Sequence, residues 1–162
     1  FARIESIDPK AMHHAIDEGK IIVVAGFQGV NKNGAVTTLG RGGSDLSAVA
    51  LAAALKADQC EIYSDVDGIY TTDPRIEPHA KKLDVISYDE MLELASLGAK
   101  VLQSRSVELA KKLNVKLYAK SSFSEDKGTL ITKENQNMEA VLVSGVVLDK
   151  NQARVTLRGV AD

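Results

Sequence analysis

The sequence contains no tryptophan, only one cysteine and few aromatic residues, with four tyrosines and three phenylalanines among its 162 residues. The single cysteine, Cys60, excludes an intrachain disulfide and a zinc site built from cysteines. The net charge of −2 argues against a nucleic-acid partner, which a basic protein would favour. The longest uninterrupted apolar run, Ala48–Leu55, is too short to cross a bilayer, and no signal peptide is visible. We therefore expect no membrane partner and a cytoplasmic location.

Two common nucleotide-binding motifs and a simple metal site are also missing. The pattern G-x-x-x-x-G-K-[ST] does not occur, because Gly29–Gly34 is followed by Ala35 and not by lysine. The pattern G-x-G-x-x-G fails because no glycine stands three residues after Gly42. These absences argue against P-loop and dinucleotide-binding proteins. His13 and His14 are adjacent, so on a helix they point about 100° apart and do not form a metal pair.

The chain does contain apolar segments with the lengths of alternating helices and strands. Ile21–Ala25 is a continuous apolar run, which predicts a buried parallel strand. Glu61–Ser64 and Val115–Ala119 are also strand-like, and the polar residues Asn31–Gly34 predict a hairpin or loop tip. Helices are predicted from Pro9 to about Glu18, at Leu46–Lys56, after the capping box Ser87-Tyr88-Asp89-Glu90, and at Val101–Leu113. Strands that alternate with helices predict an α/β fold with a mostly parallel sheet.

The most informative segment is Thr37-Thr38-Leu39-Gly40-Arg41-Gly42-Gly43-Ser44-Asp45, which leads directly into a predicted helix. Free N–H groups of a glycine-rich loop at a helix N-terminus form an anion site. The guanidinium of Arg41 is suited to bind a carboxylate or phosphate in a bidentate manner. The simpler alternative is a tight turn with a solvated arginine, in which Ser44 and Asp45 cap the helix. We favour the anion site because the arginine, the glycines and the Ser-Asp pair coincide.

A second polar segment, Ser64-Asp65-Val66-Asp67-Gly68-Ile69-Tyr70, follows a predicted strand and leads to Asp73-Pro74-Arg75. Ligands of open α/β sheets bind at the carboxyl ends of strands. Asp65 could accept hydrogen bonds from ribose hydroxyls, Tyr70 could flank a base, and Arg75 could reach phosphates. An Asx turn without a ligand is the alternative. Lys100, between two predicted helices, is either a solvated lysine or the partner of an anion.

Near its end the chain changes character. The polar stretch Thr132–Asn137 is a candidate linker, and Ala140–Val147 and Ala153–Arg158 beyond it are predicted strands. Alternating exposure in the second of these is typical of an antiparallel hairpin. We therefore predict one domain at 1–133, and a linker with the start of a second domain at 134–162.

These motifs together resemble aspartokinase, a branch of the amino acid kinase superfamily. The resemblance extends through almost the whole chain, and its segments are Gly26–Gly29, Thr37–Asp45, Ile62–Arg75, Ile86–Val107 and Ser121–Ile131. It implies a three-layer α/β/α sandwich followed by ACT regulatory domains, of which this chain would hold the first strands. It also implies transfer of the γ-phosphoryl group of ATP, with Mg²⁺, to the side-chain carboxylate of L-aspartate. This reaction is the first step toward lysine, methionine and threonine.

The resemblance also implies roles for individual residues. Asp45 corresponds to the aspartate that orients a catalytic lysine, and the substrate-binding positions are Phe27, Arg41, Gly42, Gly43 and Ser44. The ATP-binding positions are Ser64, Asp65, Tyr70, Arg75, Lys100 and Val101. A homo-oligomer is expected for the full-length parent.

One expected segment is not in this sequence. The K-F-G-G-T-S stretch of the family, which supplies the catalytic lysine, does not occur among the 162 residues. We therefore expect the chain alone to have little or no activity. The alternatives are a non-catalytic nucleotide-binding fragment, or another amino acid kinase such as a glutamate or N-acetylglutamate kinase.

Overall fold

The centre of the molecule is a four-stranded sheet. The computed structural model describes residues 3–98, 101–134, 143 and 145–148. Across the sheet the strands are β3 (Cys60–Ser64), β5 (Leu117–Ser121), β6 (Thr129–Thr132) and β4 (Val85–Ser87). β3 pairs with β5 and β4 pairs with β6 in parallel, whereas β5 and β6 are antiparallel. The mixed α/β architecture with a mostly parallel sheet agrees with the predicted fold class.

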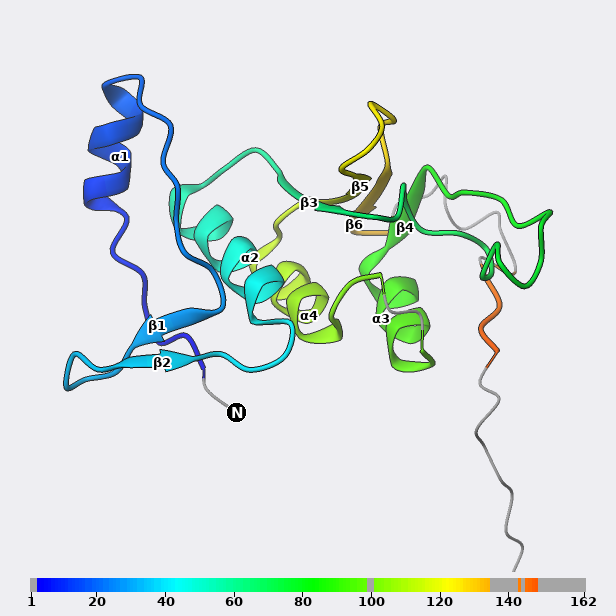
Figure 1. The fold of residues 1–162 in the computed structure, drawn as a ribbon, viewed down its shortest axis with the longest axis horizontal. Helices are drawn as coiled ribbons and strands as arrows, with labels where there is room; N and C mark the ends of the chain where they lie inside the picture. The colour runs from blue at the N-terminus through cyan, green and yellow to red at the C-terminus, as the bar shows by residue number, and fades with distance from the viewer. Residues whose placement is uncertain (1–2, 99–100, 135–142, 144, 149–162) are drawn as a thin grey trace, which may run out of the picture.

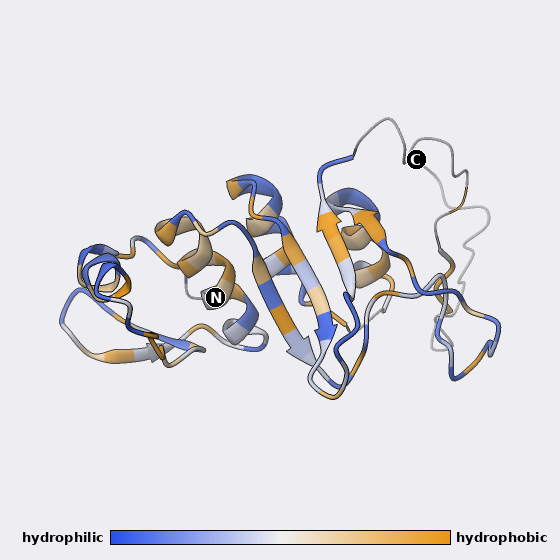
Figure 2. Ribbon diagram, turned by 90° about the horizontal axis from the view of Figure 1, so that it is seen from above, coloured by the Kyte–Doolittle hydropathy of each residue, from blue (hydrophilic) through white to orange (hydrophobic). Residues whose placement is uncertain are grey.

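Three helices pack side by side along this sheet (Figure 1). They are α2 (Gly43–Leu55), α3 (Tyr88–Ser96) and α4 (Ser104–Leu113), with α4 in contact with both of the others. The core between helices and sheet is aliphatic, and Figure 2 shows apolar colour on the helices and strands that form it. Its most buried members are Val49, Ile69, Ile86, Met91, Val107, Leu117 and Ile131.

The capping box and the hairpin tip are confirmed, whereas α4 begins at Ser104 and not at the predicted Val101. Ser87 caps α3 through a complete capping box with Glu90, as the sequence indicated. Helix α1 (Lys10–Asp17) begins directly after Pro9. Strands β1 (Gln28–Val30) and β2 (Val36–Thr38) form an antiparallel hairpin around the predicted polar tip. At that tip the side-chain oxygen of Asn31 accepts hydrogen bonds from the N–H groups of two following residues.

The prediction of a buried strand at Ile21–Ala25 is wrong for the described structure. The segment is an extended connection between α1 and β1, and the side chains of Ile21 and Val23 are 96% and 93% exposed. A strand needs a neighbour that pairs with its N–H and C=O groups, and among the described residues this segment has no strand beside it. Its apolar sequence is nevertheless typical of a buried strand.

The predicted second domain lies mostly outside the described residues. The predicted strand Ala153–Arg158 lies entirely outside them. Of the predicted strand Ala140–Val147, only residue 143 and residues 145–147 are described, and these are not in a strand. The division at residue 134 therefore stays a prediction.

Candidate functional site

The glycine loop begins helix α2 where it contacts the start of helix α4. The helix starts at Gly43 and not at Leu46, and its N-cap is Gly42, with φ of 72° in the left-handed region. A Cβ atom on Gly42 would overlap the side chain of Gln103, which is the N-cap of α4. Only glycine therefore allows the two helix N-termini to come this close.

This arrangement shows that Ser44 and Asp45 do not cap helix α2. Both residues lie in the first turn of α2, and no side chain caps the helix. The capping alternative is therefore wrong, because the helix begins before either residue. The positive ends of two helix dipoles meet at this point, which is a favourable place for negative charge.

Arg41 adds a positive charge to the same loop. The residue is exposed, and none of the described residues forms an ion pair with its guanidinium. Behind the loop, the Arg105 side chain of α4 donates a hydrogen bond of 3.2 Å to the carbonyl oxygen of Leu39. The loop is thus fixed to α4 from behind, while the Arg41 side chain remains accessible from outside.

Asp45 connects the two helices. Its carboxylate accepts a hydrogen bond from the backbone of Gln103, which lowers its pKa, but burial has the larger effect and raises the pKa above the ordinary value. A partly buried carboxylate at two positive helix ends suits a residue that orients a cationic group.

Phe27 is placed over the first turn of α2 in an unusual backbone conformation. Its φ is 70°, which is rare for a residue other than glycine. Its N–H donates to Ser47 Oγ over 3.2 Å, and its carbonyl oxygen accepts from Leu39 over 2.8 Å. A Cβ atom on Gly43 would lie 3.1 Å from the ring of Phe27. The structure therefore brings together five predicted substrate-loop residues with Asp45, namely Phe27, Arg41, Gly42, Gly43 and Ser44.

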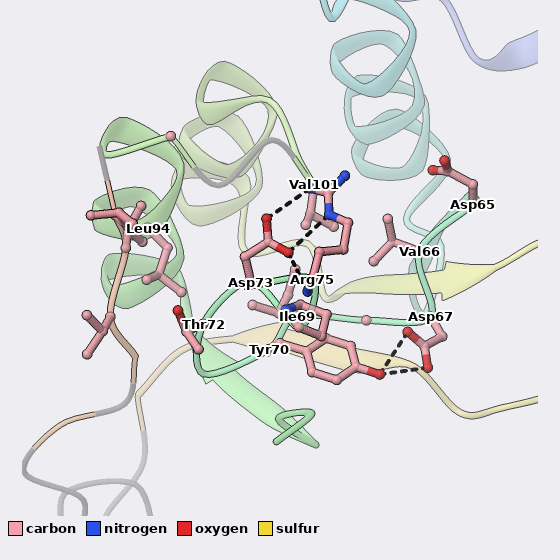
Figure 3. Close-up of a pocket in the computed structure, with 16 residues that line it drawn as sticks. Asp65, Val66, Asp67, Ile69, Tyr70, Thr72, Asp73, Arg75, Leu94 and Val101 are labelled. Carbon is pink, nitrogen blue, oxygen red and sulfur yellow. Dashed lines mark hydrogen bonds and ion pairs between the residues drawn. The ribbon is translucent and has the colours of Figure 1, made fainter. Parts of the chain in front are cut away.

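A separate pocket of about 560 Å³ follows the carboxyl end of β3. Four predicted ATP-binding residues line it, namely Asp65, Tyr70, Arg75 and Val101 (Figure 3). Its floor is held in place by Ile69, which is only 2% exposed and whose N–H donates to Thr129 Oγ1 of β6 over 2.8 Å. The pocket is thus built on the core of the sheet.

Two side-chain pairs give the pocket its polar groups. The Tyr70 hydroxyl donates to the Asp67 carboxylate over 3.0 Å, and partial burial together with this carboxylate raises the pKa of Tyr70. Arg75 binds Asp73 through two hydrogen bonds of 3.1 and 3.0 Å. This pairing lowers the pKa of Asp73, and Figure 3 shows the guanidinium directed toward Val101.

Two predicted ATP-binding residues are not among those lining the pocket. Ser64 lies at the end of β3, where its Oγ accepts a hydrogen bond of 3.1 Å from the N–H of Val66 and so shapes the turn. Lys100 lies outside the described residues. The glycine loop and the pocket are linked through the residues just before α4, because Gln103 contacts Gly42 and Val101 lines the pocket.

Sequence reasoning missed several residues of the pocket. Thr72 and Asp73 belong to the recognised segment but were not singled out, although their position after β3 was a usable signal. Leu94 of α3 and residues 146–148 gave no signal, because each appears in the sequence as an ordinary apolar residue.

Comparison with known proteins shows the family of the chain. The model of the amino acid kinase family matches residues 1–121. The chain belongs to this family. It is 62% identical to the aspartokinase of Helicobacter pylori over 165 aligned residues, which cover 99% of this chain and 41% of that protein. The chain therefore spans about two fifths of the length of the curated relatives it matches.

Solved structures of this family include aspartate kinases with the same fold. Synechocystis aspartate kinase is 58% identical, with a TM-score of 0.67 over 76% of this chain and 21% of its own. Escherichia coli aspartokinase III, solved in complex with aspartate and ADP, is 38% identical, with a TM-score of 0.70 over 80% of this chain and 29% of its own. Among the described residues, no helix has the length and apolar character that a membrane span requires.

Proposed function

We propose that the protein containing this chain is an aspartate kinase, which transfers the γ-phosphoryl group of ATP to the side-chain carboxylate of L-aspartate. The observation that carries the proposal is the contact between Gly42 and Gln103, which joins two helix N-termini beside the exposed Arg41. The names of the relatives, including a complex with aspartate and ADP, support the same reaction.

In this proposal the glycine loop binds L-aspartate. The guanidinium of Arg41 and the free N–H groups of α2 bind a carboxylate of the substrate. Asp45 orients the cationic group that neutralises charge on the transferring phosphoryl group. Phosphoryl transfer depends mainly on positioning and charge stabilisation, so a site of this composition is sufficient for its part of the reaction.

The pocket after β3 is proposed to hold ATP. Its volume of about 560 Å³ lies within the range of small-molecule sites, and it has both apolar walls and charged groups. Arg75 is close enough to the pocket to exchange its bond with Asp73 for a phosphate. No cluster of three metal ligands occurs among the described residues. Mg²⁺ is usually held by one or two carboxylates and by the phosphates themselves, and Asp65 and Asp67 are candidate carboxylates for it.

The test is release of ADP from ATP and Mg²⁺ that depends on L-aspartate. It is measured with the 162-residue chain and with the chain extended by the further residues that its gene encodes. We expect turnover with the extended protein, and little or none with the 162 residues, which contain no K-F-G-G-T-S stretch. Equal rates with glutamate or N-acetylglutamate would favour another amino acid kinase.

The alternative of a nucleotide-binding module without catalysis is tested separately. Calorimetry with ATP and Mg²⁺ measures binding, and binding by an extended protein that shows no turnover with any acceptor would favour the module.

For the extended protein we also propose a cytoplasmic homo-oligomer in lysine, methionine and threonine synthesis. Its mass in solution, measured by light scattering, tests the oligomer.

A further inference from the structure

A short segment that lies beyond the match to the family forms part of the pocket. The family model ends at residue 121, but Val146, Val147 and Leu148 line the same pocket as Tyr70 and Arg75. The N–H of Val146 donates a hydrogen bond of 2.7 Å to the carbonyl oxygen of Thr71. This contact attaches the later segment directly to the loop that follows β3.

The fit of this segment is close. A Cβ atom on Gly145 would lie 3.1 Å from the carbonyl oxygen of Thr71 and 3.3 Å from Leu94 Cδ2 of α3. The side chain of Val147 packs against the hydrophobic core. Gly145 therefore gives the backbone the room to approach the pocket, and Val147 anchors it there.

The segment makes one end of the pocket apolar. Val146, Val147 and Leu148 line the pocket, and the neighbouring Gly145 lies against Leu94. Figure 3 shows Leu94 on the opposite side of the pocket from the carboxylates of Asp65 and Asp67. An apolar surface suits the flat face of a base, and the polar end suits ribose and phosphate groups. The two ends thus match the two parts of a nucleotide.

We propose that residues 145–148 form the base-contacting wall of the nucleotide site, so that nucleotide binding and attachment of this segment favour each other. The proposal rests on the proposed function, in which ATP occupies this pocket. Val146 and Leu148 are 62% and 57% exposed, so a bound base has apolar surface to cover. By thermodynamic linkage, a change that displaces the segment weakens nucleotide binding, and a bound nucleotide stabilises the attached segment by the same free energy.

Hydrogen exchange of the extended protein, with and without ATP and Mg²⁺, tests the proposal without a variant. We expect ATP to slow exchange at the amide of Val146 and across residues 65–75. Slower exchange at 65–75 with no change at Val146 would overturn the wall and leave the proposed function intact. No change at either place would overturn both, because ATP would then not occupy the pocket.

A substitution gives an independent measurement. In Gly145→Val the added side chain meets Thr71 and Leu94, so the segment is displaced, and we expect ATP affinity measured by calorimetry to fall about tenfold, which corresponds to about 1.4 kcal/mol. The matched control is Val143→Ala, which changes a residue of the same stretch that is exposed and does not line the pocket. Unchanged affinity in a folded Gly145→Val protein, judged by circular dichroism, would overturn the proposal.

Discussion

Asp45 experiences two opposing effects, and burial has the greater influence on its pKa. The positive ends of two helices and the backbone of Gln103 favour the carboxylate, but removal from water raises the pKa. The folded protein therefore holds this proton more tightly than the unfolded chain does. The free energy of unfolding falls as the pH rises from the ordinary aspartate pKa of about 3.9 to the raised one, and stays lower above it.

The first prediction follows from this sign. Asp45→Asn removes the charge but keeps the shape and an oxygen that can accept from Gln103. We expect urea unfolding at pH 7 to show a variant at least as stable as the wild type, with an advantage that disappears below about pH 4. The extended protein with this change should lose phosphoryl transfer. The burial argument would be contradicted if the stability of the variant minus that of the wild type were smaller at pH 7 than at pH 4.

The second prediction concerns Arg41, which is exposed and contributes little to stability. Lysine keeps the charge but not the bidentate geometry, so Arg41→Lys should weaken aspartate binding in the extended protein by about 1.5–3 kcal/mol, or roughly tenfold or more. The unfolding free energy should change by no more than about 0.5 kcal/mol. The KM for aspartate and a denaturation curve measure the two effects. The control Lys116→Ala, at an exposed site before β5, should leave both unchanged.

At the scale of elements, the contact between α2 and α4 depends on a single missing side chain. The third prediction compares Gly42→Ala with Gly34→Ala, because the two glycines have φ of 72° and 78°. A Cβ atom has no neighbour within 4 Å at Gly34, but overlaps Gln103 at Gly42. The free energy of unfolding of both variants should fall by about 1–2 kcal/mol, because alanine is unfavourable in the left-handed conformation. Urea unfolding should show a larger loss of stability for Gly42→Ala than for Gly34→Ala. Equal losses of stability would show that the two helices can move apart at no cost.

Local signals predicted elements well where the cause was itself local. The capping box of Ser87 and the hairpin tip at Asn31 depend on side chains a few residues away, so the sequence predicted both. The strands β4 and β6 have only three and four residues, and no periodicity is visible at that length. The prediction of a strand at Ile21–Ala25 failed for the opposite reason. Its apolar pattern is clear, but the described residues provide no neighbouring strand to pair with it.

The candidate site divides in the same way. The string from Leu39 to Asp45 carries its proposed chemistry in consecutive residues, so the sequence alone pointed to it. The position of Gln103 against Gly42, and of residues 146–148 in the pocket, depends on packing between distant parts of the chain. No property of Val146 in the sequence distinguishes it from an ordinary core residue, so only the structure places it in the site.

At the scale of the whole molecule, apolar surface is concentrated near the connection between α1 and β1. Met12, Ile16, Ile22, Leu51 and Leu55 line a shallow apolar hollow beside this segment. Ile21 and Val23 are almost fully exposed. Surface of this kind favours association between molecules.

The fourth prediction is that this surface causes the 162-residue chain to self-associate. Val23→Lys places a charge in the middle of the segment and should shift light scattering toward the monomer. The matched control is Phe123→Ser, because Phe123 is 84% exposed but lies outside the segment. The prediction would be contradicted if the wild-type chain stayed monomeric at high concentration. It would also be contradicted if both substitutions changed the light scattering equally.

The buried thiol of Cys60 makes the opening of the sheet measurable as a chemical rate. Burial, with the nearby charges of Asp45 and Glu61, raises the pKa of this thiol to about 11, and the residue is only 7% exposed. A thiol reagent therefore attacks only in the intervals when β3 separates from β5 and Cys60 meets solvent. Since the chain contains no second cysteine, each labelled molecule records one such event. When the reagent reacts faster than the strand closes, the labelling rate gives the frequency with which the strand leading into the proposed nucleotide pocket opens.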